Sequence, residues 1–433
     1  MRAEERAETG RLVGLGLRGV TGVVRDAHGA IATSVFGSVR RHLGPAARPV
    51  VTTVEIAHNT IAGGVYLATG RGLELVAAGA GLATSRRPVR DSTDPRGPGD
   101  LSDDPRARVL MAILHGFHGD KLAAHGSPVA YPMTLRRSGR DVPLSRDGVA
   151  AAYPGAVGTV VVFVHGFVGT EAMWKRRPDD DPTGRATSYG RRLEDDADVS
   201  AVWVRYNTGL RVSANGRALH DLLRALHETW PVPLERVVLV GHSMGGLVVH
   251  SALAQAAPDE PWTTVTTDTV TLGTPHHGTP LERSANTAAA MLADREATRW
   301  AADIIRYRSD GIRDLRHGNL LEQDWTGHDP EDPVDHRTLA HRHPHVGHLA
   351  VVATVARRPE SRLGGLLGDL VVGRDSARGF GEAVAEGLED ERAEGAAVAR
   401  TRTVLLGGLT HVALLNDERV YPFVRDVVTA PRR

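Results

Sequence analysis

The stretch from Glu235 to Val249 places a serine in surroundings that could make it a nucleophile. Val237 to Val240 form a short apolar run rich in β-branched residues, which is typical of a strand buried on both faces. Gly241-His242-Ser243-Met244-Gly245 follows directly, and the apolar residues from Leu247 to Ala256 indicate a helix. A strand, a tight turn and a helix are the context in which Gly-x-Ser-x-Gly carries a nucleophilic serine. The two glycines fit such a turn, because a strained serine needs neighbours without a Cβ.

Acyl transfer would also need N–H groups aimed at the oxygen that becomes negative, and losing one such donor costs about 3–4 kcal/mol. A second buried strand, Thr159 to Val164, runs straight into His165-Gly166-Phe167-Val168-Gly169. A glycine-rich turn at a strand end leaves N–H groups available for this role. We therefore predict an oxyanion hole formed by the N–H groups of Phe167 and Met244. Both turns would be supported by their neighbours His165, Gly166, Gly241, His242 and Gly245, and the alternative is a plain strand-end turn.

A second copy of the triplet, His115-Gly116-Phe117, lies within a helical pattern over residues 107–124. No β-branched run precedes it. We therefore do not expect this copy to form an oxyanion turn.

Further strands and helices alternate along the chain. A helix is expected from Asn215, a plausible N-cap, and Pro231 and Pro233 would end it. A hairpin is expected over residues 132–144. Strand, helix, strand, helix is the rhythm of a parallel sheet covered on both faces, so we predict an α/β fold. The remaining strands are expected at 201–206, 269–272, 348–355 and 401–407.

Three motifs together resemble the bacterial lipase/esterase branch of the α/β-hydrolase superfamily. They are GHSMGG at 241–246, HGF at 165–167 and GTPHHG at 273–278. The resemblance covers about residues 132–433 and implies a mostly parallel, doubly wound sheet. It also implies a helical cap or lid, here about 280–345, that shapes the acyl pocket. The alternative for this insertion is packing that only covers the sheet.

The resemblance also assigns the acid and the base, which follow the serine in that order. Gly368-Asp369-Leu-Val-Val-Gly-Arg-Asp-Ser-Ala377 is similar to the family's G-D-G-x-V-P-x-x-S-A segment, whose aspartate is the triad acid. The chain departs from it at Leu370 and Gly373, so Asp375 is the reserve candidate. His411 begins a segment much like the family's H-x-x-L-L-N-D-x-x-V-Y, which carries the triad histidine. The implied set is Ser243, Asp369 and His411, with no metal or organic cofactor.

The stretch from Asp335 to His348 is dense in histidine. Imidazoles and carboxylates are zinc ligands, but no pair here has a recognised helical or knuckle spacing. We expect a solvated loop rather than a metal site.

The rest of the chain gives its organisation and bounds its function. We expect an N-terminal helical segment at 1–84, a linker at 85–108, a connecting helix at 109–128 and the catalytic domain at 129–433. The N-terminal helices are interpreted either as a hairpin docked on the main domain or as an amphipathic platform for lipid.

The composition limits the possible functions. Lys+Arg and Asp+Glu balance at 52 each, so charge does not indicate nucleic acid as a partner. With no cysteine, disulfides and thiolate sites are excluded. No signal peptide or membrane span is evident, which favours a soluble, cytoplasmic protein.

The sequence thus predicts a serine hydrolase acting on a small-molecule or lipid ester. The aliphatic surroundings of the serine turn favour an apolar acyl part. Two alternatives remain open: an acyltransferase with the same triad, and a non-catalytic scaffold that binds lipid or a partner.

Overall fold

The structure is a computed structural model that describes the sheet-bearing part of the chain and one preceding helix. The chain divides into two compact units, residues 1–111 with 284–307 and residues 112–283 with 308–433. The predicted N-terminal helical segment at 1–84 and the reserve acid Asp375 lie outside the described residues. The described residues are 105–127, 130–175, 188–279, 282, 308–338, 340, 343–358, 369, 371–373, 376–377 and 401–431.

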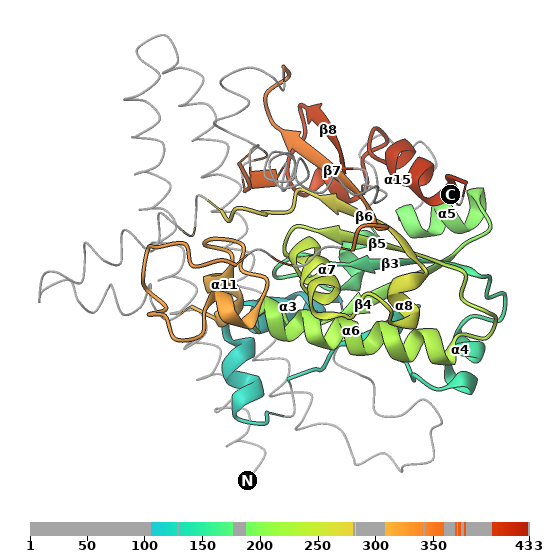
Figure 1. Cartoon of the computed structure of the whole chain (residues 1–433), viewed down its shortest axis with the longest axis horizontal. Helices are drawn as coiled ribbons and strands as arrows, with labels where there is room; N and C mark the ends of the chain where they lie inside the picture. The colour runs from blue at the N-terminus through green and yellow to red at the C-terminus, as the bar shows by residue number, and fades with distance from the viewer. Residues whose placement is uncertain are drawn as a thin grey trace, which may run out of the picture. The chain divides into compact units, whose positions relative to one another are not determined.

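An eight-stranded sheet organises the second unit, with the strand order β2-β1-β4-β3-β5-β6-β7-β8. The hairpin β1–β2 is antiparallel and β1 pairs antiparallel with β4, whereas all pairs from β4 through β8 are parallel. The predicted fold class is therefore confirmed (Figure 1). The strands are β1 (Thr134–Arg137), β2 (Arg140–Val142), β3 (Thr159–Val164), β4 (Ser200–Arg205), β5 (Arg236–His242), β6 (Thr266–Leu272), β7 (Gly347–Thr354) and β8 (Thr401–Gly407).

Helices cover both faces of the sheet, as parallel strands require. In Figure 1, α6 (Val212–Thr229), α7 (Met244–Gln255) and α8 (Pro261–Thr264) lie on one side of the sheet. On the other side are α5 (Tyr189–Asp196) and α15 (Tyr421–Thr429). The remaining described helices are α3 (Pro105–Ala124), α4 (Arg146–Ala152), α11 (Asp310–Asp314) and the 3₁₀ turns Glu171–Trp174, Glu322–Asp324 and Ala413–Leu415.

Strand β3 shows how the sequence produces this double-sided core. Val160, Val162 and Val164 pack into the core on the α6–α7 face, while Val161 and Phe163 pack into the core on the α5–α15 face. All five are fully buried. Burying a side chain of this size contributes about 1.5–3 kcal/mol, so an unbroken apolar run is stable only in a central strand.

The start of α6 differs from its prediction. The helix begins at Val212, and Asn215 is a buried residue of its first turn rather than its N-cap. The Asn215 amide donates instead to the carbonyl oxygens of Asn207 and Leu210, at 3.0 and 3.3 Å. The cap comes from a distant segment, because the Asp314 carboxylate accepts the Val212 N–H at 2.7 Å. A carboxylate at this end of a helix also interacts favourably with the helix dipole.

Helix α3 contains the second His-Gly-Phe triplet, at 115–117, which agrees with its exclusion as an oxyanion turn. Within the described residues, no helix combines the length and apolar character needed to cross a bilayer.

Candidate active site

Ser243 lies on a strained turn between β5 and α7. Its backbone has φ 53° and ψ −126°, a left-handed conformation that side chains rarely adopt and that costs about 1–3 kcal/mol. Ser138 and Val168 are the other described non-glycine residues with positive φ. The serine residue is 8% exposed, at the carboxyl end of a central parallel strand. Open α/β sheets bind their ligands at this end of the strands.

The glycines on each side of the serine permit this turn. A Cβ on Gly241 would lie 2.5 Å from both the nitrogen and the Cα of Gly246. A Cβ on Gly245 would lie 2.3 Å from the Val164 carbonyl oxygen. Because contacts this short do not occur, only glycine lets α7 begin against the end of β3.

The turn after β3 lies beside the serine. A Cβ built on Gly166 would lie 2.9 Å from the Ser243 Cβ. Val168, two residues on, has φ 54°, and its N–H donates to the Thr208 hydroxyl at 3.4 Å. Phe167 lies between them, and Met244 opens α7, where the first N–H groups have no acceptor within the helix. The structure therefore brings the two predicted oxyanion donors to the end of the sheet that carries Ser243.

His165 has a structural environment. Its ring stacks on Tyr206 with centroids 4.4 Å apart. Nδ1 lies 2.9 Å from the Gly166 carbonyl oxygen, and the Tyr206 N–H donates to Nε2 at 3.4 Å, which together fix a neutral Nδ1–H tautomer. Burial lowers the pKa of His165 to about 4. A fully buried neutral imidazole suits the supporting role predicted for this residue.

Asp369 and His411 are in direct contact. The His411 Nδ1 lies 2.6 Å from the Asp369 Oδ2, and the aspartate is 1% exposed. The other carboxylate oxygen, Oδ1, accepts the N–H groups of Val371 and Val372 at 3.0 and 2.8 Å. The His411 N–H also donates to the Asp369 carbonyl oxygen at 3.1 Å. These bonds hold the carboxylate in one orientation, facing the imidazole.

The loop that carries His411 is attached to the serine turn. The His242 Nε2 lies 3.1 Å from the His411 carbonyl oxygen, and the two rings are 4.7 Å apart. Gly273, at the end of β6, completes the surroundings, since a Cβ there would lie 3.1 Å from both the Asp369 Oδ2 and the His411 Nδ1. Residues after β3, β5, β6 and β8 thus meet at one end of the sheet.

Residues 156–326 match the family described as the PGAP1-like alpha/beta domain. Together with the sheet order, this match indicates an α/β-hydrolase fold for the sheet-bearing part of the chain.

Solved structures of bacterial enzymes are similar to the α/β-hydrolase domain at low identity. The mature form of lipase BlEst2 from Bacillus licheniformis is 20% identical, with 62% of this chain and 91% of that chain covered and a TM-score of 0.38. Its propeptide form is 17% identical, with 70% and 55% covered and a TM-score of 0.41. Carboxylesterase CesB (YbfK) from Bacillus subtilis is 12% identical, with 64% and 85% covered and a TM-score of 0.32. No curated protein matches the chain.

The solvated loop predicted for the histidine-dense stretch is wrong for His343, whereas His348 lies in β7, in agreement with the strand predicted at 348–355. His343 is 3% exposed, with Nε2 at 2.8 Å from the Leu253 carbonyl oxygen. His348 is 5% exposed and belongs to β7, which pairs with β6. Because strand pairing draws this segment into the α/β-hydrolase domain, its side chains meet residues far away in the sequence.

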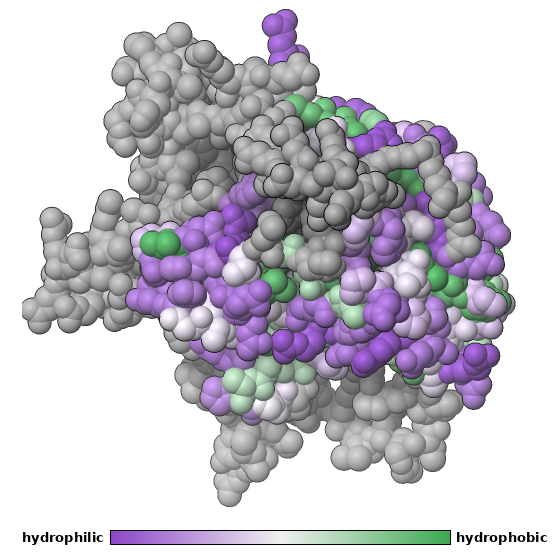
Figure 2. Space-filling view, in the orientation of Figure 1, coloured by the Kyte–Doolittle hydropathy of each residue, from purple (hydrophilic) through white to green (hydrophobic). Residues whose placement is uncertain are grey.

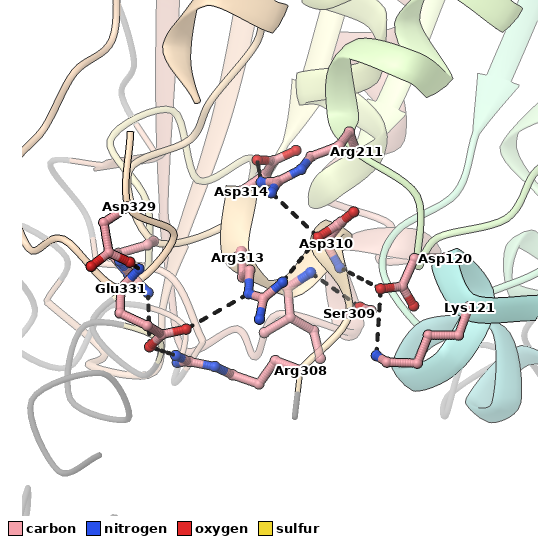
Figure 3. Close-up of polar contacts among 12 residues, drawn as sticks. Asp120, Lys121, Arg211, Arg308, Ser309, Asp310, Arg313, Asp314, Asp329 and Glu331 are labelled. Atoms are coloured by element: carbon pink, nitrogen blue, oxygen red, sulfur yellow. Dashed lines mark hydrogen bonds and ion pairs between the residues drawn. The ribbon is translucent and has the colours of Figure 1, made fainter. Parts of the chain in front are cut away.

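Salt bridges stabilise the described part of the predicted cap, residues 308–338, and join it to the start of α6. The guanidinium groups of Arg308 and Arg313 both face Glu331, at 2.7 and 3.8 Å (Figure 3). Arg211 pairs with Asp314 at 2.8 Å, which ties α11 to the start of α6. Residues 280–281 and 283–307 lie outside the described residues.

Thr208 is a residue of this site that the sequence motifs did not identify. It is 1% exposed and accepts the Val168 N–H beside the predicted oxyanion turn. Its position three residues after β4, at the carboxyl end of the parallel strands, is the signal that could have indicated it.

Proposed function

We propose that the chain is a serine hydrolase that cleaves carboxylic esters through an acyl-enzyme intermediate. The observation that carries this proposal is the buried 2.6 Å contact between His411 and Asp369. The loop of His411 is itself hydrogen-bonded, through its carbonyl oxygen and His242, to the strained turn that holds Ser243. A nucleophile, a base and an orienting acid are the three parts that this chemistry requires.

Each residue has one role in the proposed reaction. The Asp369 Oδ2 accepts the His411 Nδ1–H, which leaves the Nε2 lone pair to take the Ser243 hydroxyl proton. The serine oxygen attacks the ester carbonyl, and the bond to the alcohol breaks as His411 returns that proton to the leaving oxygen. Water, deprotonated by the same histidine, then attacks the acyl-enzyme. The bond between the acyl group and the Ser243 oxygen breaks, His411 returns the proton to that oxygen, and the acid is released. The N–H groups of Phe167 and Met244 stabilise the negative oxygen in both steps.

Exposed valines beside the acid and the base support an apolar acyl group. Val371 and Val412, each 40% exposed, lie two residues after Asp369 and directly after His411. A small-molecule or lipid ester would place its chain against such side chains. The enzyme names of the similar structures, a lipase and a carboxylesterase, agree with this class of substrate.

Lipid contact is proposed for the segment 1–84, which the sequence predicts to be helical, rather than for the described surface. Figure 2 shows a mostly hydrophilic face on the described residues, with small and separate hydrophobic patches. A membrane-binding surface needs a continuous apolar area, and the hydrophobic patches on this face of the described residues are separated from one another by hydrophilic residues.

The first test is labelling with a fluorophosphonate, followed by peptide mass spectrometry and assays with p-nitrophenyl esters of increasing chain length. We expect the label on Ser243, with both labelling and turnover abolished in Ser243→Ala. Adding an acceptor alcohol distinguishes the two reactions, because an acyltransferase would form a new ester where a hydrolase releases acid. Folded wild-type protein without label and without turnover would contradict the proposal.

A further inference from the structure

Three histidines from different elements meet outside the proposed triad. They are His250 in α7, His276 in the loop after β6 and His348 in β7. One ring nitrogen of each lies within 4.8 Å of those of the other two. The ring centroids are 4.9–5.8 Å apart, His276 and His348 are buried, and His250 is half-buried.

Two threonine hydroxyls of β6 contact the rings of His348 and His276. The Thr269 hydroxyl lies 3.3 Å from the Gly347 carbonyl oxygen and donates to it, so its oxygen accepts the His348 Nδ1–H at 2.8 Å. The His348 Nε2 then carries the lone pair. The Thr271 hydroxyl lies 3.5 Å from this Nε2 and 3.5 Å from the Nε2 of His276. Histidines that bind metals usually donate their second ring N–H in this way, which fixes the tautomer and leaves the other nitrogen as the ligand.

We propose that His250, His276 and His348 bind one divalent transition-metal ion, and that zinc is the ion that fits best. Zinc accepts neutral imidazole nitrogens at 2.0–2.1 Å in tetrahedral geometry, which sets their mutual distance at about 3.3 Å. From a separation of at most 4.8 Å, the nitrogens need to approach each other by no more than about 1.5 Å. The fourth position falls to water or to the Thr271 hydroxyl between two of the rings. Three imidazoles without a carboxylate suit zinc, copper or nickel rather than magnesium or calcium.

A metal here would stabilise the loop region that carries the proposed acid. The His276 N–H donates to the Ser376 carbonyl oxygen at 3.1 Å, and the His277 N–H donates to the Ser376 hydroxyl at 3.0 Å. That hydroxyl donates in turn to the Gly278 carbonyl oxygen at 2.7 Å. The ion would therefore join α7, β7 and the loop after β6, and the last of these holds the segment after Asp369. Its proposed role is structural, so it is independent of the ester hydrolysis proposed above.

The test is zinc binding to the full-length protein, purified without a histidine tag and stripped with a chelator. Calorimetric titration is expected to give one zinc ion per chain. At zinc concentrations a hundredfold above Kd, the Tm is expected to rise by about 5 °C. Cobalt bound in place of zinc should show the visible absorption of a tetrahedral site, which reports on the ligands without any activity assay. Unchanged Tm and no visible cobalt band in folded protein would overturn the proposal.

The chain has 21 histidines, including these three. Matched variants distinguish this site from the other histidines. His250→Gln and His276→Gln should each weaken zinc binding at least tenfold. His345→Gln is the control, because His345 lies near β7 but its Nε2 contacts the Thr263 carbonyl oxygen. Near-UV circular dichroism establishes that each variant is folded. Zinc binding that survives both cluster variants, or that His345→Gln weakens equally, would refute the assignment.

Discussion

The orientation of the Asp369 carboxylate yields a specific prediction for Asp369→Asn. Oδ1 is occupied by the N–H groups of Val371 and Val372, so the carbonyl oxygen of the asparagine must take that place. Its NH₂ group then faces the His411 Nδ1, where Oδ2 lies 2.6 Å away in the native chain. A donor at this position favours the tautomer with hydrogen on Nε2. That tautomer cannot accept the serine proton.

The magnitude follows from what the active tautomer would cost. In the variant, a proton on the His411 Nδ1 would face the asparagine NH₂ group, so two buried donors would point at each other. This arrangement forfeits a hydrogen bond to a charged group, about 1.5–3 kcal/mol, and leaves a buried donor without an acceptor, about 1–3 kcal/mol. The total of about 3–6 kcal/mol corresponds to a loss of about 10²- to 10⁴-fold in kcat. KM should change much less, because the substrate does not contact the carboxylate in this mechanism.

Steady-state kinetics with a p-nitrophenyl ester measures this loss directly. Asp417→Asn is the matched control, since Asp417 lies six residues after His411 but pairs with Arg419. It should keep kcat within about twofold of the wild type. If Asp369→Asn, folded by near-UV circular dichroism, keeps kcat within tenfold of the wild type, the tautomer argument and the assignment of the acid are both wrong.

Three further predictions concern the turns and their support. Gly245→Ala places a Cβ 2.3 Å from the Val164 carbonyl oxygen and should lower the free energy of unfolding, measured in urea titrations, by about 2–4 kcal/mol. The control is Gly155→Ala, where a Cβ would have nothing within 4 Å and the effect should be near zero. Equal effects of the two substitutions would contradict the close-packing argument. Thr208→Val removes the acceptor of the Val168 N–H and should reduce kcat/KM about five- to thirtyfold, whereas an unchanged value would show that this bond does not position the turn. For His165 the folded pKa of about 4 lies below the ordinary histidine pKa of 6.5, so the unfolded chain takes the proton first and stability is lost as pH falls from 6.5 towards 4. The wild type should lose about 2–3 kcal/mol more between pH 7 and pH 4.5 than His165→Asn, and parallel pH profiles of the two proteins would refute this.

Most of the fold prediction came from local sequence patterns, such as apolar or alternating runs bounded by turn residues. The strand predicted at 159–164 coincides with β3, and the one predicted at 401–407 coincides with β8. Both are short apolar or alternating runs bounded by turn residues, so their period and ends are visible in the sequence. The serine turn was equally visible, because its glycines meet a backbone requirement that is local to five residues.

What the sequence left out depends on contacts between distant segments. The cap of α6 is Asp314, about a hundred residues from the helix start, so Asn215 seemed the better candidate. The histidine cluster joins positions 250, 276 and 348, whose spacing follows no ligand motif. Only the pairing of β6 with β7 and the docking of α7 bring them together.

The Asp314 carboxylate has a consequence for evolution and engineering. It stands in the insertion between β6 and β7, yet it caps the N-terminus of α6, a helix of the central fold. Exchanging this insertion with that of a relative would remove the acceptor of the Val212 N–H together with an acid that pairs with the Arg211 guanidinium. A chimaera is expected to fold well only when the incoming segment supplies an acid at the same point. The insertion and the domain beneath it are therefore constrained to change together.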